Sequence, residues 1–310
     1  MKTQSATILS RPRAPSRRET RERWLGIGLV APSVLLIVLL ILYPFIYNIW
    51  MSLQNVSLTQ GTTGWAGLNN YLYLFQWDEF WHGLFIDIVW AAASIAGQLI
   101  CALVISHLLN ASFTGQNLAR ALVILPWTVS AVVIAFIWRW MLNDLFGIVN
   151  LALLSLGVVH KPVLFFVTPT GALATVIGIN IWRGMPFMAL TLLGGLQSIP
   201  HELYEAAQTD GANFWQEFWH ITLPSLNRII AILIVLRGIW VFNWFDLMWL
   251  TTGGGPDNST AILPILAYVT GFMSYRMSRS AAIGVMMALV LLVFVIMMSR
   301  LMLREDESSA

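Results

Sequence analysis

Hydrophobic residues along this chain gather into six runs that are separated by shorter, more polar segments. Each run is long enough to cross a bilayer core of about 30 Å as a helix. The pattern therefore predicts an all-α, polytopic membrane protein with six transmembrane helices, built as one domain over residues 24–304. The runs cover residues 25–47, 84–106, 119–141, 171–193, 227–250 and 281–303.

The segments between the runs predict how the chain is threaded through the membrane. Residues 51–83 contain three Trp but no Lys or Arg, which fits an outer loop with aromatic residues at the membrane interface. Residues 107–119 are short and polar and predict an inner turn. Residues 142–170 are interrupted by Gly and Pro, and predict an outer connection that partly re-enters the membrane or rests on it.

Basic residues predict the orientation. The positive-inside rule places a strongly basic terminus in the cytoplasm, and an even number of crossings returns the other terminus there. We therefore expect residues 1–23 to form a basic cytoplasmic tail and residues 305–310 a short acidic one. Arg276 and Arg279, in the outer segment after the fifth run, depart from the rule. The basic residues before the first run are Lys2, Arg11, Arg13, Arg17, Arg18, Arg21 and Arg23.

The most polar segment outside the termini is residues 200–224, between the fourth and fifth runs. Pro200 and Glu202 predict the start of a helix, because proline suits a first turn and an acidic side chain complements the helix dipole. Gly211 predicts its end, since glycine adopts the left-handed conformation that stops a helix. A second amphipathic turn follows, and Pro224 is expected to end the segment before the next span. The segment predicts a bent cytoplasmic lever.

An alternative is an interfacial helix that lies on the bilayer. Such helices carry basic residues that meet anionic lipid, whereas this segment has acidic residues and no Lys or Arg. The charge pattern favours a protein partner over lipid. The acidic residues are Glu202, Glu205, Asp210 and Glu217.

Composition agrees with a membrane location and excludes several other classes. A chain of 310 residues that is 58% hydrophobic and 10% charged cannot cover a soluble core with polar surface. The basic N-terminal arm lacks interleaved aromatic residues and adjoins a span, which argues against nucleic-acid binding. The first run is longer than the apolar region of a signal peptide and is expected to stay as a helix. Cys101, the only cysteine, is expected to be a packing residue.

Charged residues inside the runs are candidates for function, because charge within a bilayer is unfavourable unless it faces a partner or a water-filled cavity. Arg183 lies near the middle of the fourth run, Arg237 near the middle of the fifth and Asp87 near the start of the second. Arg237, Trp240 and Trp244 are spaced to share one helical stripe. Indole rings beside a guanidinium group suit a carbohydrate, which offers apolar C–H faces and hydroxyl groups. The alternative is that these side chains pack against neighbouring helices.

The polar segment also carries the motif Glu-Ala-Ala-x3-Gly-x9-Ile-x-Leu-Pro, from Glu205 to Pro224. This motif resembles the EAA loop in the membrane-spanning subunits of binding-protein-dependent ABC importers, where two short helices joined at a glycine dock into a cytoplasmic ATPase subunit. The resemblance implies a coupling loop between the fourth and fifth transmembrane helices. The implied coupling residues are Glu205, Ala206, Ala207, Asp210, Gly211 and Pro224.

Further motifs resemble one group of these permeases. Three segments are similar to segments of the permeases for maltose-type oligosaccharides, other sugars and glycerol phosphate. They are Leu-Pro-Trp at residues 125–127, Asn-Ile-Trp-Arg-Gly-Met-Pro-Phe at residues 180–187 and Leu-Thr-Thr-Gly-Gly-Gly-Pro at residues 250–256. Gly184 and Pro186 are expected to weaken the fourth helix and present backbone carbonyl groups to a ligand. The resemblance implies that the translocation path is lined by Trp127, Asn180, Trp182, Arg183, Gly184, Arg237, Trp240 and Trp244.

The resemblance also implies partners and a location. We expect a second homologous permease subunit, two ATP-binding-cassette ATPase subunits that hold ATP and Mg²⁺, and an external solute-binding protein that delivers a sugar or related polyol. The location implied is a bacterial or archaeal cytoplasmic (inner) membrane.

The residues predict no catalytic centre in this chain. A phosphate-binding loop needs a lysine after paired glycines, and neither Lys2 nor Lys161 follows such glycines, so ATP is expected to bind elsewhere. The five histidines are scattered, and no metal or nucleic acid is expected. Two alternatives stay open. An ion-driven secondary transporter would depend on Asp87 as its ionisable relay, and a membrane scaffold would leave Arg183 and Arg237 unexplained.

Overall fold

A computed structural model describes residues 17–59 and 61–308, which fall into two units, residues 1–50 and 51–310. Most of the predicted basic tail, residues 1–16, lies outside the described residues. The first unit is a helix that comprises α1 (Arg17–Ile37), a π-helical turn (Val38–Leu42) and most of α2 (Tyr43–Ser52). Within this helix, Ile27–Ser52 is long and apolar enough to cross a membrane, as the first hydrophobic run predicts.

The second unit is mostly helical, and four of its described helices have the length and apolar composition of membrane spans. Two correspond to the second and fourth runs, α4 (Asp78–Asn110) and α8 (Pro169–Leu196). The last is α14 (Met277–Ser308), whose apolar part ends at Met302 and whose helix includes residues 305–308 of the predicted acidic tail. The remaining span, Phe214–Phe242, joins α10 (Phe214–Glu217) to α11 (Leu223–Phe242) through a π-helical turn, Phe218–Thr222.

The third run does not form the single straight helix that hydropathy predicts. It is divided into α5 (Gln116–Thr128) and α6 (Ala131–Met141), which meet at an angle of 95°. Pro126 weakens the end of α5, and the Ser130 hydroxyl starts α6 by accepting a hydrogen bond from the Val133 N–H at 3.4 Å. The predicted total of six spans is therefore reached only if this bent pair is counted as one crossing.

The fifth run is also placed differently from the prediction at both of its ends. Helix α11 stops at Phe242, and a separate helix α12 (Phe245–Thr252) follows, so Trp244 does not lie on the helical stripe expected for it. At the other end, Pro224 does not end the polar segment. The Leu223 N–H bonds to Phe218 O in the π-helical turn, and the helix continues through Pro224 near the start of α11, where a missing N–H is tolerated.

The core of the second unit lies where α4, α8 and α11 pack against one another. Gly97 allows the close approach of α4 to α8, because a Cβ atom there would lie 2.3 Å from Ile181 Cδ1. Trp90 on α4 is fully buried, and its indole N–H donates to the carbonyl oxygen of Val241 on α11 at 3.0 Å. The helices α4, α8 and α11 thus form a packed group that holds the polar side chains described below.

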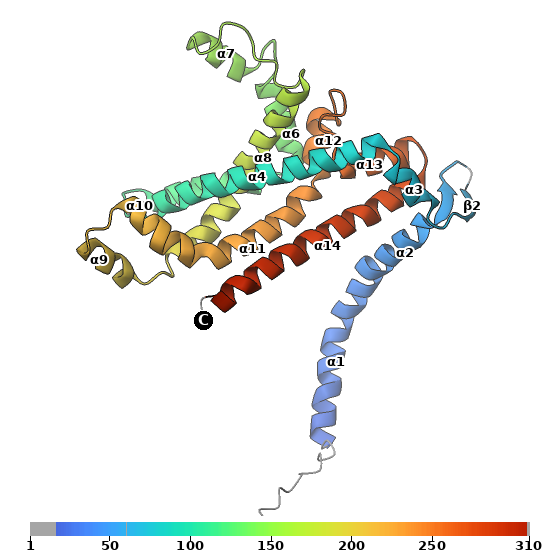
Figure 1. Ribbon diagram of the computed structural model, residues 1–310, viewed down its shortest axis with the longest axis horizontal. Coiled ribbons are helices and arrows are strands. Elements are labelled where there is room, and N and C mark those ends of the chain that lie inside the picture. The colour runs from blue at the N-terminus through green and yellow to red at the C-terminus, as the bar shows by residue number, and fades with distance from the viewer. Residues whose placement is uncertain (1–16, 60, 309–310) are drawn as a thin grey trace, which may run out of the picture. The chain divides into compact units, whose positions relative to one another are not determined.

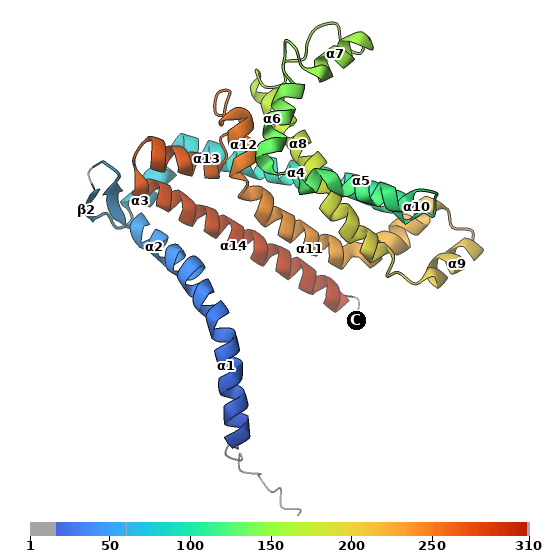
Figure 2. The ribbon, with the colours of Figure 1, turned by 180° about the vertical axis from the view of Figure 1, so that it is seen from behind.

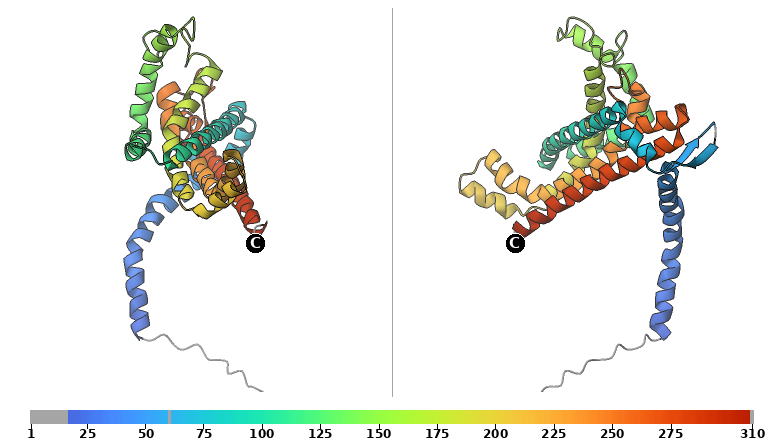
Figure 3. Two further views of the ribbon diagram at one scale, coloured as in Figure 1. Left: turned by 90° about the vertical axis from the view of Figure 1, so that its left-hand side faces the viewer. Right: turned by 45° about the vertical axis from the view of Figure 1, so that its right-hand side comes forward.

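Short elements occupy the two ends of this unit (Figures 1 to 3). At one end lie α9 (His201–Thr209), α10 and the C-terminal end of α14. The opposite end carries the remaining elements, including an antiparallel hairpin, which is the one departure from an all-helical chain among the described residues. With the exception of α7 (Ile148–Ser155), which projects at the top of Figure 1 away from the hairpin, these elements are β1 (Gln54–Ser57), β2 (Gly61–Trp65), α3 (Asn69–Phe75), α12, α13 (Leu263–Tyr268) and a π-helical turn (Val269–Met273).

The two arginines that depart from the positive-inside rule lie at this hairpin end. Arg276 and Arg279 line a polar cavity of about 420 Å³ together with residues of the hairpin. The Arg279 guanidinium lies over the ring of Tyr73 on α3, with 3.6 Å from its carbon to the ring centroid. Arg279 therefore has a local cation–π partner, which stabilises its charge within the segment predicted to be external.

Candidate functional site

The polar segment forms two helices joined by a bend, as its sequence predicts. Helix α9 ends at Asp210, and Gly211 has a φ of +83°, a conformation that favours glycine. The Gly211 N–H donates to Gln208 O at 3.0 Å, which satisfies a carbonyl group at the end of α9. Asn213 then starts α10 through reciprocal hydrogen bonds with Gln216, of 3.0 and 2.7 Å.

Three contacts hold this bent segment in place, one within the segment and two to α4. The Tyr204 hydroxyl on α9 is 2.9 Å from the Thr222 hydroxyl, in the turn that leads into α11. The ring of His107, at the end of α4, lies 6.0 Å from the Phe214 ring and 5.5 Å from the Phe218 ring. The segment is thus connected to α4 by ring contacts, and α9 is connected by a hydrogen bond to the turn that leads into α11.

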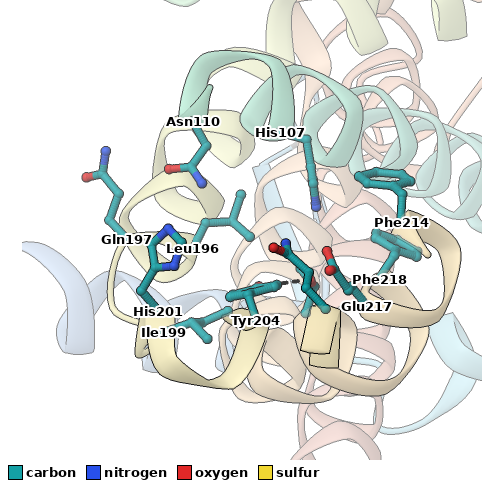
Figure 4. A pocket seen from close by; sticks show the side chains of 12 residues that line it. His107, Asn110, Leu196, Gln197, Ile199, His201, Tyr204, Phe214, Glu217 and Phe218 are labelled. Carbon is teal, nitrogen blue, oxygen red and sulfur yellow. Dashed lines mark hydrogen bonds between the residues drawn. The ribbon is translucent and has the colours of Figure 1, made fainter. Parts of the chain in front are cut away.

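These contacts surround a cavity of about 330 Å³ between the ends of α4 and α8 and the bent segment. Figure 4 shows the side chains of His107, Tyr204, Glu217 and Phe218 grouped around it, with the hydrogen bond from Tyr204 drawn as a dashed line. The cavity mixes charged, polar and aromatic side chains. With this cavity between them and the helix ends, α9 and α10 form an arm that projects from the unit (Figure 1).

The outer surface of this arm is exposed and mixes acidic and large apolar side chains. Trp215 and Trp219 are 65% and 58% exposed, and Phe214, whose ring also contacts His107 beside the cavity, is 57% exposed. A contiguous group of exposed aromatic residues marks a surface for contact with another protein or a membrane. Of the six predicted coupling residues, Ala207 is half-buried and the other five are exposed: Glu205, Ala206, Asp210, Gly211 and Pro224.

A second group of functional candidates lies inside the spans, on α4, α8 and α11. The Arg237 side chain is 2% exposed, and its Nε donates to the amide oxygen of Gln98 at 2.8 Å. The Gln98 amide nitrogen in turn donates to Asn180 O on α8 at 3.1 Å. Gly184 makes room for this chain of hydrogen bonds, since a Cβ atom there would lie 2.4 Å from both the Arg237 and Gln98 side chains.

Aromatic rings extend from this buried chain to the exposed side of the helices. The Trp127 ring on α5 stacks on Phe187 of α8 at 5.7 Å, and Phe187 lies 5.3 Å from Trp240 on α11. The Arg237 guanidinium lies 5.7 Å from the Trp240 ring, and the Arg183 guanidinium lies 4.1 Å from the Trp244 ring. We call these rings, with Gln98, Asn180, Arg183, Gly184 and Arg237, the polar–aromatic strip.

The structure brings together seven of the eight residues predicted to line a path. One face of α8 carries four residues at helical spacing, namely Asn180, Arg183, Gly184 and Phe187. Trp244 lies beyond the end of α11, but its ring contacts the Arg183 guanidinium on this face. Trp182 is separate, because it points to another side of α8 and meets Trp138 of α6 edge-on at 5.4 Å.

Two members of the strip, Gln98 and Phe187, are absent from the predicted lining. Gln98 stands out in the sequence as an amide within an apolar run, which is the signal that could have identified it. The expected weakening of α8 is wrong in its effect, since the helix is continuous through Gly184 and Pro186. The carbonyl of Asn180 still accepts a side-chain hydrogen bond without any break in the helix.

The strip is positively charged and incompletely hydrogen-bonded. Among the described residues no carboxylate forms an ion pair with Arg183 or Arg237, and the pair that is present joins His201 to Glu205 on α9. Arg183 Nε, Arg237 Nη2 and both amide atoms of Asn180 are buried without a hydrogen-bond partner. Buried polar atoms of this kind call for a partner, because leaving them unpaired is unfavourable.

Fold and site together define a multi-span helical membrane protein with a polar–aromatic strip inside its spans and a projecting arm at one end (Figure 1). Residues 95–304 match the family of binding-protein-dependent transport system inner membrane components. The chain belongs to this family of ABC transporter permeases.

Similar proteins agree with this assignment. A probable ABC transporter permease protein of Brucella suis is 34% identical over 93% of this chain and 100% of its own length. The trehalose/maltose transport system permease protein MalF of Thermococcus litoralis is 34% identical over 82% of this chain and 85% of its own length. The crystal structure of a bacterial ABC transporter involved in the import of alginate, an acidic polysaccharide, contains a chain with the same fold. Its TM-score is 0.81 at 24% identity, over 93% of this chain and 98% of that one.

Proposed function

We propose that this chain is one of two permease subunits in an ATP-driven importer of sugars or related polyols. Two ATPase subunits would hold ATP and Mg²⁺, and an external binding protein would deliver the substrate. The polar–aromatic strip supports this function most directly, since sugar rings stack on indole and phenyl faces while hydroxyl groups bond to amide and guanidinium groups. The relationship to a trehalose/maltose permease supports the sugar class.

In this proposal the arm formed by α9 and α10 is the contact with the ATPase. Its exposed aromatic and acidic residues suit a protein surface, and its anchors to α4 and α11 connect that surface to helices that carry Gln98 and Arg237. When the ATPases close, the arm would move and tilt these helices. The strip would then open alternately to the outside and to the cytoplasm of a bacterial or archaeal cell.

The proposed orientation places the arm in the cytoplasm. The arm and the C-terminal end of α14 lie at the same end of the second unit (Figures 1 and 3), in keeping with a cytoplasmic C-terminus. The basic residues that precede the first span favour a cytoplasmic N-terminus by the positive-inside rule. The hairpin end would then face the external binding protein.

The geometry of Asp87 does not favour the alternative of an ion-driven secondary transporter. This carboxylate is fully buried, and its Oδ2 accepts a hydrogen bond of 3.3 Å from the N–H of Leu263, the first residue of α13. An acidic group at a helix N-terminus stabilises that helix. This hydrogen bond gives Asp87 a structural role between α4 and α13, while its Oδ1 is buried without a hydrogen-bond partner.

Gly211→Pro tests the function of the arm in the assembled importer. A φ of +83° is closed to proline, whose ring fixes φ near −65°, so the substitution should distort the bend at a strain of about 1–3 kcal/mol. We expect the complex in proteoliposomes to lose ATP-dependent sugar uptake while the chain still inserts into the membrane. Uptake at the unmodified rate would contradict the proposal.

Gly157→Pro is the matched control. Gly157 also follows a short helix, has a φ of +69° and donates its N–H to a carbonyl three residues earlier, but it lies after α7, away from the arm. It tests whether backbone strain alone abolishes uptake. Uptake should persist in this variant.

A further inference from the structure

The charge of the polar–aromatic strip defines the substrate more closely than its aromatic rings do. Arg183 and Arg237 both lie in spans, and they are neighbours because Arg183 adjoins Gly184, where a Cβ atom would lie 2.4 Å from Arg237 Nη2. Charged side chains in spans normally pair with an opposite charge or face water. Here neither guanidinium has a carboxylate partner among the described residues. The strip therefore holds two positive charges and no negative one.

The contacts that these arginines do make leave their charge in place. Arg237 bonds to the neutral amide oxygen of Gln98 and lies beside the Trp240 ring, while Arg183 lies over the Trp244 ring. An amide and an aromatic face stabilise a cation, but they do not neutralise it. Both groups keep donor atoms free, at Arg183 Nε and Arg237 Nη2. These two donors, from neighbouring like charges, suit a single anion placed between them.

A neutral sugar would leave this arrangement unsatisfied. Its hydroxyl groups could pair with Asn180, whose amide atoms are both free and fully buried, but they could not offset the two charges. An acidic group would pair with the arginines, and the sugar ring that carries it would reach the Trp240 and Phe187 rings next to them. The strip would thus bind both the charged group and the sugar ring of one molecule.

Resting on the proposed function, we infer that the substrate is an anionic sugar, whose carboxylate, phosphate or sulfonate group binds between Arg183 and Arg237. Asn180 would hold a hydroxyl group of the sugar, and Trp240 and Phe187 would contact the apolar ring face. Arg183 and Arg237 are then specificity-determining residues, and replacing them should discriminate charged sugars from neutral ones.

The test compares sugars that differ only in charge. The complete importer, assembled from this chain, its partner permease, ATPases and binding protein, is reconstituted into proteoliposomes. Digalacturonate is compared with galactobiose, and glucose 6-phosphate with glucose, so the two pairs distinguish a carboxylate from a phosphate. We expect ATP-dependent uptake of at least one anionic sugar and at least tenfold less of its neutral counterpart, as loss of a charge-assisted hydrogen bond implies.

Variants then connect this preference to the two arginines. Arg183→Gln and Arg237→Gln should each reduce uptake of the anionic sugar by about 10- to 100-fold relative to the neutral one, whereas Arg183→Lys should keep much of the preference. Arg139→Gln is the matched control, because Arg139 lies near the end of α6 and bonds to the Leu250 carbonyl outside the strip. It should leave the preference unchanged. Gel filtration of each complex checks assembly.

The outcomes separate the two proposals. Uptake of neutral sugars only, or equal loss of both sugars in the glutamine variants, would overturn the anionic substrate and leave the sugar importer standing. The second result would mean that the arginines are structural or are neutralised by a partner subunit. ATP-dependent uptake of none of the four sugars would contradict both proposals.

Discussion

At the scale of single residues, the strip depends on a glycine as well as on its charged side chains. Gly184 faces Arg237 and Gln98 so closely that a Cβ atom there would displace one of these side chains, which hydrogen-bond to each other and on to Asn180. The Asn-x-Trp-x-Gly pattern in the sequence identifies Gly184, but it does not say which side chains the glycine accommodates. That information lies in α4 and α11, far away along the chain.

Gly184→Ala should therefore displace Arg237 and break its bond to Gln98. Overpacking of a buried site costs about 1–3 kcal/mol, so we expect a lower midpoint of thermal unfolding and a loss of sugar uptake. Gly178→Ala is the matched control on the same helix, since a Cβ atom there would meet nothing within 4 Å. That variant should be as stable as the parent protein or more so, because alanine favours helices. If both variants behave alike, Gly184 does not serve as a spacer.

Trp240→Ala tests whether the rings serve the substrate or only the packing. Trp240 is 44% exposed on this chain, so its removal should disturb the core little, while the stacking surface next to Phe187 is lost. We expect a higher KM for the transported sugar with the assembly of the complex unchanged. An unchanged KM for every sugar would instead assign Trp240 to packing against a neighbouring helix.

At the scale of elements, hydropathy predicts where spans lie but not where they break. The second and fourth runs correspond well to α4 and α8, because a long apolar run has no competing structure in a membrane. The third run looks equally continuous in sequence, yet the chain turns by 95° at Ser130. The local signals for this bend are weak, because a helix tolerates Pro126 near its end and Ser130 only favours a helix start. The packing of α5 on α8 and of α6 on α12 therefore decides whether the run is bent or straight.

The arm offers a prediction at this scale, because a side-chain hydrogen bond joins α9 to the π-helical turn that leads into α11. Tyr204→Phe removes the bond to the Thr222 hydroxyl, which contributes about 1 kcal/mol. We expect faster hydrogen exchange across α9 and a lower ratio of sugar transported to ATP hydrolysed, since a looser arm transmits less motion.

Ser225→Ala is the control for this change. It removes a hydroxyl group that bonds within one helix, to Ile221 O at 2.6 Å, and so does not connect two elements. Its coupling ratio should equal that of the parent protein. Equal ratios in Tyr204→Phe and the parent would show that the bond does not transmit motion.

At the scale of the whole molecule, the sequence predicts a class and a set of candidate residues, and three-dimensional packing connects them. The motif from Glu205 to Pro224 could be identified in sequence, but its attachment to α4 through His107 could not, since His107 lies about a hundred positions earlier. Gln98 was missed for the same reason. A polar residue in a span is visible in the sequence, but its partner on another helix is not.

Orientation in the membrane is a property of the whole chain, and cysteine labelling measures it. Cys101 is the only cysteine, so Cys101→Ser gives a background free of thiols. In that background, Thr62→Cys places a thiol on the exposed hairpin strand β2, and Thr209→Cys places one at the exposed end of α9. The positive-inside rule predicts a cytoplasmic N-terminus and hence an external hairpin, so a membrane-impermeant maleimide should label Thr62→Cys in intact spheroplasts. It should label Thr209→Cys only after the membrane is permeabilised. The reverse pattern would place the arm outside the cell, where no ATPase could reach it, and would contradict the coupling role of Gly211.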